Sequence, residues 1–214
     1  MKLCHYIHSR AVDRTPRLGI LLDEQTVLEP QICQAIDYER EGFYEPLKRA
    51  KHKYPSSLYE FLKISESPIE ELEEAYGLYL FLKMVGDLEL KNGAPMTYTL
   101  GEEVRLGKPL DKIEVYRDFY THEKHVKKGF EKRGEPMPQA WYDMPVFYKG
   151  PTSGFIGPHE EILWPYYSDK LDYELELAAV VGRDARNVKV SNADQHILGF
   201  TILNDVSARD IQKK

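Results

Sequence analysis

Residues 171–182 read Leu171-Asp172-Tyr173-Glu174-Leu175-Glu176-Leu177-Ala178-Ala179-Val180-Val181-Gly182. The run alternates acidic and aliphatic residues and then becomes wholly apolar, which is typical of a β-strand with one chemically distinct end. Successive side chains of a strand point to opposite faces, so Glu174 and Glu176 share one face, about 6.6 Å apart. Their like charges repel, and burial would add a desolvation cost. A divalent cation removes both costs because hard cations bind carboxylate oxygens; the alternative is that the pair lies on a solvated face.

The composition of the 214-residue chain excludes several classes of protein. Its formal net charge of -6 argues against a nucleic-acid-binding protein, for which a basic surface is the usual mark. The two cysteines, Cys4 and Cys33, provide neither a disulfide framework nor a cysteine-based metal site, which suits a reducing cytoplasm. No apolar run reaches the length of a membrane span or resembles a signal peptide. We therefore expect a cytoplasmic protein with no nucleic-acid or membrane partner.

Residues 1–97 have the pattern of a small α+β domain. Short strands are predicted at 3–7, 17–22 and 26–28, and helices at 31–38, 56–62 and 67–85. The last helix has the clearest boundary signals, with Ser67 as N-cap, Pro68 at the first helical position and Gly86 as C-terminal cap.

Residues 98–214 consist of shorter segments interrupted by glycine and proline, and they predict a second domain made mainly of strands. A strand is predicted at 110–115 and a longer one at 197–204, which ends at Asp205. Ser207 is expected to cap a short helix after that strand. The fold class predicted for the whole chain is mostly β, and α+β overall.

Four acidic residues stand at the ends of apolar runs, namely Asp118, Glu174, Glu176 and Asp205. Carboxylates from three segments can together form one octahedral oxygen site, which suits Mg²⁺, Mn²⁺ or Ca²⁺ better than zinc. Spacing alone is weak support because any acidic protein offers such a set. Taken singly, the histidine, tyrosines and arginine near these acids more often have surface or packing roles.

Three motifs occur in a fixed order along the second domain. They are Asp118-Phe119-Tyr120 followed by His125, then the acidic residues 171–176, then Asn204-Asp205-Val206-Ser207-Ala208-Arg209-Asp210-Ile211-Gln212. Together they resemble the fumarylacetoacetate hydrolase family, over residues from near 100 to 214. The resemblance implies a fumarylacetoacetate hydrolase-like mixed β-sheet roll for residues 98–214. Long members of the family also carry a small N-terminal domain, which residues 1–97 would match.

The resemblance further implies roles for nine residues. The metal carboxylates would be Asp118, Glu174, Glu176 and Asp205, with His125 as the general base that activates water. The substrate contacts would be Tyr120, Tyr148, Arg209 and Gln212. A 2-oxo or β-diketo acid offers two oxygens that can chelate a divalent cation (Mg²⁺, Mn²⁺ or Ca²⁺), which acts as a Lewis acid and stabilises the enolate that leaves.

The activity implied by the resemblance is divalent-metal-dependent hydrolysis of a C–C bond in a β-diketo acid or acylpyruvate, through a metal-bound enolate, as in the catabolism of aromatic compounds. Decarboxylation, hydration, dehydration and isomerisation of 2-oxo acids use the same enolate chemistry and remain alternatives. Homodimers are common in the family, so a second copy of the chain is an expected partner.

The resemblance also indicates parts of the family domain that this sequence does not contain. Family members continue well beyond the position of Lys214, and some short members carry an orienting glutamate where this chain has Lys128. We expect a longer product or a second chain to supply the remainder. Without it, the strands would leave unpaired edges and an open apolar face. A truncated, non-catalytic fragment that needs a partner chain is the third hypothesis.

Overall fold

The computed structural model describes residues 1–10 and 14–212 of the chain. The chain divides into two compact units, the first made of Met1–Asp111 with Gly157–Lys214 and the second of Lys112–Ile156. The described residues combine helices and antiparallel strands, which confirms the predicted α+β class. Within these residues, no helix is both long and apolar enough to cross a membrane.

The N-terminal part of the first unit contains a five-stranded antiparallel sheet in the order β4-β3-β2-β1-β5. Its strands are β1 (Lys2–His8), β2 (Arg17–Leu21), β3 (Thr26–Leu28), β4 (Thr97–Thr99) and β5 (Val104–Leu106). The predicted strands at 3–7, 17–22 and 26–28 are therefore confirmed. The sheet reaches residue 106, and the domain boundary expected between residues 97 and 98 stays a prediction.

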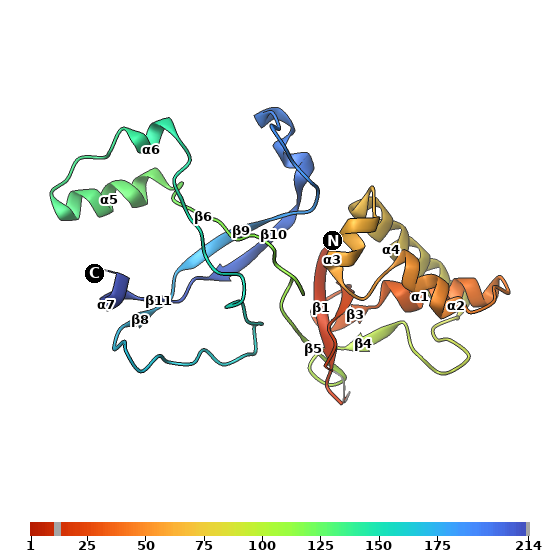
Figure 1. Ribbon diagram of the computed structural model, residues 1–214. Helices are drawn as coiled ribbons and strands as arrows, with labels where there is room; N and C mark the ends of the chain where they lie inside the picture. The colour runs from red at the N-terminus through yellow and green to blue at the C-terminus, as the bar shows by residue number, and fades with distance from the viewer. Residues whose placement is uncertain (11–13, 213–214) are drawn as a thin grey trace. The chain divides into compact units, whose positions relative to one another are not determined.

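Four helices lie beside this sheet (Figure 1). They are α1 (Pro30–Arg40), α2 (Pro46–Lys53), α3 (Leu58–Ile64) and α4 (Pro68–Val85). Their buried residues form one cluster with Leu18, Ile20 and Leu28 of the sheet. The opposite sheet face buries a smaller cluster around Tyr6 and Val27.

Ser67 and Gly86 occupy the predicted N-cap and C-cap positions of α4, whereas Ser207 does not cap a helix. Gly86 ends α4 in the left-handed conformation, with φ 85°, as predicted, and Pro68 is its first residue. The Ser67 side chain makes no capping hydrogen bond, whereas Ser57 caps α3 by accepting from the Glu60 amide. Ser207, the other predicted cap, lies in strand β11 (Ser207–Ala208).

The C-terminal part of the first unit consists of short antiparallel pairs. β9 (Leu175–Val181) pairs with β10 (Ile197–Asn204), and β8 (Leu171–Asp172) pairs with β11. The 3₁₀ helix η1 (Val190–His196) precedes β10, and α7 (Arg209–Gln212) follows β11. β10 has the predicted bounds 197–204. The run 171–182 is not one strand, because Tyr173 and Glu174 separate β8 from β9 and the two segments pair with different partners.

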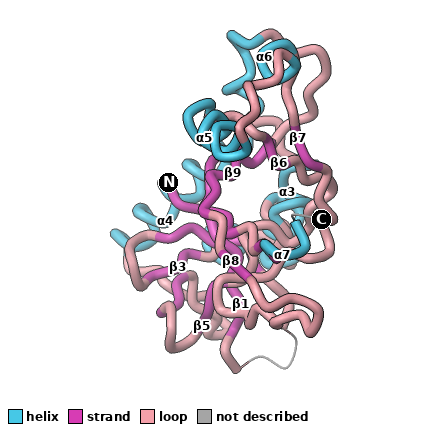
Figure 2. The backbone as a smooth tube through the Cα atoms, turned by 90° about the vertical axis from the view of Figure 1, so that its left-hand side faces the viewer, coloured by secondary structure: helices cyan, strands magenta, loops and turns pink. Residues whose placement is uncertain are grey.

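The second unit is small and contains a two-stranded pair and two helices (Figure 2). β6 (Asp118–Phe119) pairs with β7 (Phe147–Tyr148), and between them lie α5 (Glu123–Arg133) and α6 (Ala140–Asp143). The strand predicted at 110–115 is absent, since these described residues form no strand.

Candidate functional site

The β9–β10 pair brings three of the predicted metal acids to one end of a ribbon. In its antiparallel register Glu176 lies opposite Leu203. Two residues before Glu176, the Glu174 carbonyl oxygen accepts a hydrogen bond from the Asp205 amide (3.0 Å). Opposite residues of antiparallel strands share a face, so Glu174, Glu176 and Asp205 belong to one face of the ribbon. Both glutamates are half-buried on that face.

Asn204 fixes the backbone at this acidic end. Its side-chain oxygen accepts a hydrogen bond from the Glu174 amide (3.2 Å), at the point where the chain leaves β8 and enters β9. A side-chain amide that bonds to the backbone in this way can replace a ladder hydrogen bond where two strands separate. Asn204 thereby holds Glu174 just before the start of β9.

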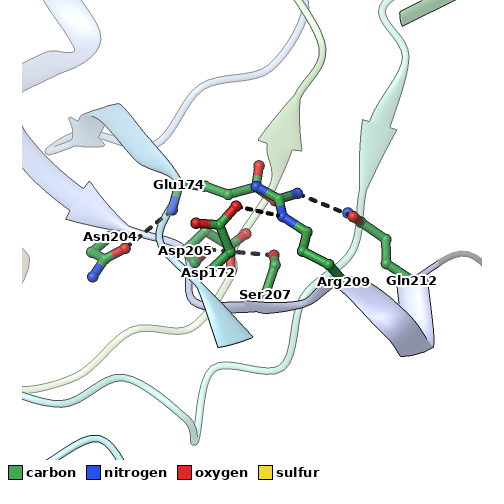
Figure 3. A network of polar contacts seen from close by, with 7 residues as sticks. All are labelled: Asp172, Glu174, Asn204, Asp205, Ser207, Arg209 and Gln212. Atoms are coloured by element: carbon green, nitrogen blue, oxygen red, sulfur yellow. Dashed lines mark hydrogen bonds and ion pairs between the residues drawn. The ribbon is translucent and has the colours of Figure 1, made fainter. Parts of the chain in front are cut away.

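The Arg209 guanidinium lies between two carboxylates (Figure 3). Its Nε donates to Asp172 Oδ2 (3.0 Å), and its Nη1 donates to Glu174 Oε1 (2.5 Å) and to Gln212 Oε1 (3.1 Å). The hydrogen bond to Asp172, followed by the charge of Glu174, raises the pKa of Arg209 above its usual value. Arg209 is thus a permanent cation within this acidic group.

Two predicted substrate contacts, Arg209 and Gln212, are therefore joined by a direct hydrogen bond. In the structure, the guanidinium predicted to bind a substrate carboxylate contacts two carboxylates of the protein itself.

The second unit contains the remaining predicted residues. Asp118 lies directly opposite Tyr148 in the β6–β7 pair, and Tyr120 follows β6. The rings of Tyr120 and His125 are in edge contact, with centroids 6.4 Å apart. His125 lies in the first turn of α5, where its amide donates to the His122 carbonyl oxygen. The structure thus places Asp118, Tyr120, His125 and Tyr148 on the β6–α5 connection and its partner strand.

A hollow in the second unit is lined by Tyr120, Thr121 and residues 141–146. The Trp141 indole donates to the Tyr120 carbonyl oxygen (2.7 Å), and the Tyr142 hydroxyl donates to Glu123 Oε1 (2.8 Å). These two bonds join α6 to the segment that carries Tyr120 and to the start of α5.

The acids of the first unit suit a hard divalent cation in their chemistry. Glu174, Glu176 and Asp205 supply only carboxylate oxygens, which are the donors that Mg²⁺, Mn²⁺ and Ca²⁺ prefer. Glu174 already contacts one cationic group, the Arg209 guanidinium. Among residues 1–10 and 14–212, however, no three His, Cys, Asp or Glu side chains converge on one point. The carboxylate oxygens are therefore suitable ligands for a divalent cation. In the structure, however, the Glu174 carboxylate contacts the Arg209 guanidinium.

The cysteines have no part in this chemistry. Cys4 and Cys33 are buried and unpaired in the structure, and burial raises the pKa of each thiol to about 12. Neither is a thiolate near neutral pH, and the thiolate is the form that binds metals.

Asp172 and Asn204 are missing from the predicted site, although both contact its residues. The alternation that selects Glu174 and Glu176 also selects Asp172, two residues earlier, so that rule could have found it. The role of Asn204 follows from the break in the strand, which the alternation does not reveal.

Residues 114–214 match the family model described as fumarylacetoacetate (FAA) hydrolase, C-terminal. The uncharacterized protein MJ1656 of Methanocaldococcus jannaschii is 44% identical over 72 residues, which are 34% of this chain and 30% of that protein. The human mitochondrial oxaloacetate tautomerase FAHD2A is 34% identical over 84 residues, 39% of this chain and 26% of that protein. In both cases the match spans less than half of the relative's length.

Among solved structures, 5-carboxymethyl-2-hydroxymuconate delta-isomerase from Mycobacterium smegmatis aligns with a TM-score of 0.52 at 20% identity. The alignment covers 100% of this chain and 58% of that one. At this identity the likeness shows the fold alone.

Proposed function

We propose that this chain, whose residues 114–214 belong to the fumarylacetoacetate hydrolase family, carries part of an enzyme that uses a divalent cation to act on a 2-oxo or β-diketo acid. The observation that carries the proposal is the shared face of Glu174, Glu176 and Asp205 at the end of β9–β10. The reaction that we favour is hydrolysis of a C–C bond in an acylpyruvate or a related β-diketo acid.

Glu174, Glu176 and Asp205 would hold the cation, with Asp118 as the fourth carboxylate that the sequence predicts. When bound, a cation of this kind supplies Lewis acidity that polarises a carbonyl and stabilises negative charge on the enolate that departs. The remaining chemistry belongs to side chains of the protein.

His125 is the proposed general base. An imidazole nitrogen would take a proton from water while the water oxygen bonds to the substrate carbonyl carbon. The C–C bond then breaks, its electron pair becomes the enolate, and protonation of the enolate carbon releases the 2-oxo acid. The edge contact between the Tyr120 and His125 rings supports the assignment because it places a proposed substrate contact beside the imidazole.

Arg209, Gln212, Tyr120 and Tyr148 are the proposed substrate contacts. Arg209 offers the fork of N–H groups that matches a carboxylate. In the structure Nε contacts Asp172 and Nη1 contacts Glu174, so a substrate carboxylate that binds these two nitrogens would replace one of these partners. Gln212 already contacts Arg209 and would stay beside the bound carboxylate.

Tautomerisation of a 2-oxo acid is the second candidate. The relative that favours it is the human oxaloacetate tautomerase, at 34% identity over 84 residues. Enol–keto exchange needs the same stabilised enolate and a proton donor or acceptor, but it breaks no C–C bond. Residues that bind the substrate and the cation would serve either reaction.

Two assays on this chain with added Mg²⁺ or Mn²⁺ distinguish these reactions. Hydrolysis of acetylpyruvate is read as pyruvate released, and tautomerisation as decay of the enol form of oxaloacetate. We expect pyruvate release that falls by about a hundredfold or more in His125→Asn, since a general base contributes on the order of 10²–10⁴. His122→Asn, which changes the N-cap of the same helix, is the matched control.

The proposal for hydrolysis is wrong if neither assay depends on the added cation, or if the two histidine variants behave alike. Turnover of oxaloacetate enol without pyruvate release would favour the tautomerase. The homodimer and the completing chain predicted from the sequence remain proposals that a measurement of solution mass can test.

A further inference from the structure

Asp172 contacts the candidate site through Arg209. Asp172 accepts from Arg209 Nε, while Arg209 Nη1 contacts Glu174 (Figure 3). The guanidinium therefore uses different nitrogens for the two carboxylates. Because each nitrogen has its own partner, the contact with Asp172 can persist while the contact with Glu174 is broken.

The backbone holds Asp172 close to Arg209. In the β8–β11 pair, Asp172 lies opposite Ser207, two residues before Arg209. The Arg209 amide continues this pairing by donating to the Lys170 carbonyl oxygen (2.8 Å). The Asp172 carboxylate is thus presented to Arg209 by paired backbone, whereas Glu174 lies beyond the end of β8.

A second polar contact fixes the same two segments to each other. The buried Ser168 hydroxyl donates to Asp210 Oδ1 (2.6 Å), and the Asp169 amide donates to Asp210 Oδ2 (3.2 Å). The hydrogen bond from Ser168 lowers the pKa of Asp210, which therefore remains an acceptor near neutral pH. Residues 168–172 and 207–210 consequently form one framework around the Asp172–Arg209 contact.

We propose that Asp172 is a positioning residue that retains the Arg209 guanidinium beside the metal acids, so that Arg209 can release Glu174 to a divalent cation without leaving the site. The proposal rests on the proposed metal-binding role of Glu174. In this arrangement the Arg209 guanidinium offsets the charge of Glu174 before the cation binds. After the cation binds, Arg209 Nε keeps its contact with Asp172, and Nη1 becomes available to a substrate carboxylate.

The charges explain why Asp172 matters. A guanidinium that contacts Glu174 competes with a cation for the same carboxylate, and its positive charge repels the cation. Asp172 supplies a second carboxylate that offsets this charge and provides an alternative partner. Among the described residues, removing the Asp172 charge would leave Glu174 as the sole ion-pair partner of Arg209. Mn²⁺ binding should then weaken by about tenfold.

The first test reads the Arg209 contact without any metal. In an NMR spectrum of this chain, the ¹⁵Nε–¹Hε signal of Arg209 is assigned by its loss in Arg209→Lys. We expect this signal to shift and to exchange faster with water in Asp172→Asn, and to return towards the wild-type position in Asp172→Glu. Asp169→Asn is the matched control, because Asp169 contacts the framework through its backbone amide.

The second test is a double-mutant cycle with Mn²⁺ as the probe, read as the dissociation constant from calorimetry. Asp172→Asn should weaken binding by about tenfold relative to Asp169→Asn, and Arg209→Gln should strengthen it. In the Arg209→Gln background, Asp172→Asn should weaken binding no more than Asp169→Asn does, because Asp172 acts through Arg209.

Two results would overturn the proposal. One is an Arg209 Nε signal that is the same in Asp172→Asn as in the wild type. The other is equal weakening by Asp172→Asn with and without Arg209, which would mean that Asp172 acts by its own charge. Failure of the proposed function would look different. The wild-type chain would then either not bind Mn²⁺ saturably or bind it equally well after Glu176→Gln. The Arg209 signal would still report whether Asp172 holds the guanidinium.

Discussion

Arg209 donates to Asp172, Glu174 and Gln212 through Nε and Nη1, so a substrate carboxylate that binds these two nitrogens must replace a partner. Partly exposed ion pairs of this kind are each worth about 0.2–1 kcal/mol. A charge-assisted, two-pronged bond to a substrate is stronger than that. The contacts seen in the structure are therefore compatible with the substrate role that the sequence predicts for Arg209.

Buried Glu29 provides a prediction about stability. Its carboxylate is 1% exposed and accepts from the Tyr6 hydroxyl (2.5 Å) and from Arg17 Nη1 (3.2 Å). Glu29→Gln removes the charge that both donors face, so we expect the free energy of unfolding to fall by about 1.5–3 kcal/mol. Urea unfolding measures this change, with exposed Glu24→Gln as control. Equal stability of the two variants would show that the network contributes little.

His5 predicts how stability depends on pH. Its Nδ1 contacts the Pro109 carbonyl oxygen and its Nε2 accepts from the Leu58 amide (3.1 Å each), so the ring is held neutral. Burial lowers the pKa of His5 below 6.5, although the Asp111 carboxylate 3.5 Å away opposes this. The unfolded chain therefore gains the proton at a higher pH than the folded chain, and stability is lost as pH falls below about 6.5.

Urea unfolding near pH 7.5 and near pH 5.5 tests this prediction, with both values chosen to bracket the ordinary histidine pKa of about 6.5. His5→Gln should lose stability less steeply than wild type on acidification, whereas His52→Gln should keep the wild-type dependence. The same slope in His5→Gln and wild type would exclude His5 as the titrating group.

The elements show what periodicity can predict and where it fails. Residues 197–204 form a strand with the predicted bounds, because the apolar run ends where Asn204 and Asp205 begin to serve as polar partners. The alternation over residues 171–177 has no interruption, yet the run divides at Tyr173 and Glu174. Alternation specifies which residues share a face, but the division depends on pairing with β10 and β11, which no local pattern encodes.

Replacing Gly19 in β2 or Gly77 in α4 by alanine should have opposite effects on stability. A Cβ on Gly19 in β2 would lie 2.6 Å from Val27 Cγ1 and 2.9 Å from Tyr6 Cδ1, whereas a Cβ on Gly77 in α4 would have no neighbour within 4 Å. We expect Gly19→Ala to cost about 1–3 kcal/mol through overpacking. Gly77→Ala should gain about 0.5–1 kcal/mol because alanine loses less backbone entropy in a helix.

Thermal unfolding of the two alanine variants beside wild type provides the measurement. A lower melting temperature for Gly19→Ala and a higher one for Gly77→Ala would agree with the described packing. Stabilisation by both substitutions would contradict the close contact between β2 and its neighbours.

In the whole molecule, the face of β9–β10 opposite the acids is apolar and open. Leu175 and Leu177 of β9 are 74% and 71% exposed, and Phe200 and Ile202 of β10 are 64% and 75% exposed. The alternation that orients the acids one way necessarily orients these side chains the other way. Contiguous apolar surface of this kind is uncommon on monomeric proteins and marks a surface suited to contact with other groups.

This face predicts binding of an apolar dye. The folded chain should enhance the fluorescence of anilinonaphthalene sulfonate, and Ile202→Lys should reduce that enhancement because it places a charge in the middle of the face. Gln195→Lys adds the same charge at an exposed position of η1 and serves as the control. An unchanged signal in Ile202→Lys would locate the dye elsewhere.

The sequence motifs predict which residues belong to the candidate site, but they do not predict how those residues are arranged in space. The motifs select Glu174, Glu176 and Asp205, and the register of β9–β10 places these three on one face. They also select Asp118, Tyr120 and His125, which the structure places in the second unit. Contacts that depend on side-chain partners distant in sequence, such as Asp172 with Arg209, are not encoded in the spacing of either motif.

The most direct test of the central claim is to locate bound Mn²⁺ on this chain by paramagnetic broadening of backbone amide signals. We predict that small amounts of Mn²⁺ broaden the amides of Glu174, Glu176 and Asp205 first, and that Glu176→Gln removes this selectivity. Broadening that begins instead at the exposed glutamates of α4, near Glu70 and Glu74, would contradict the assignment of the β9–β10 acids as the cation site.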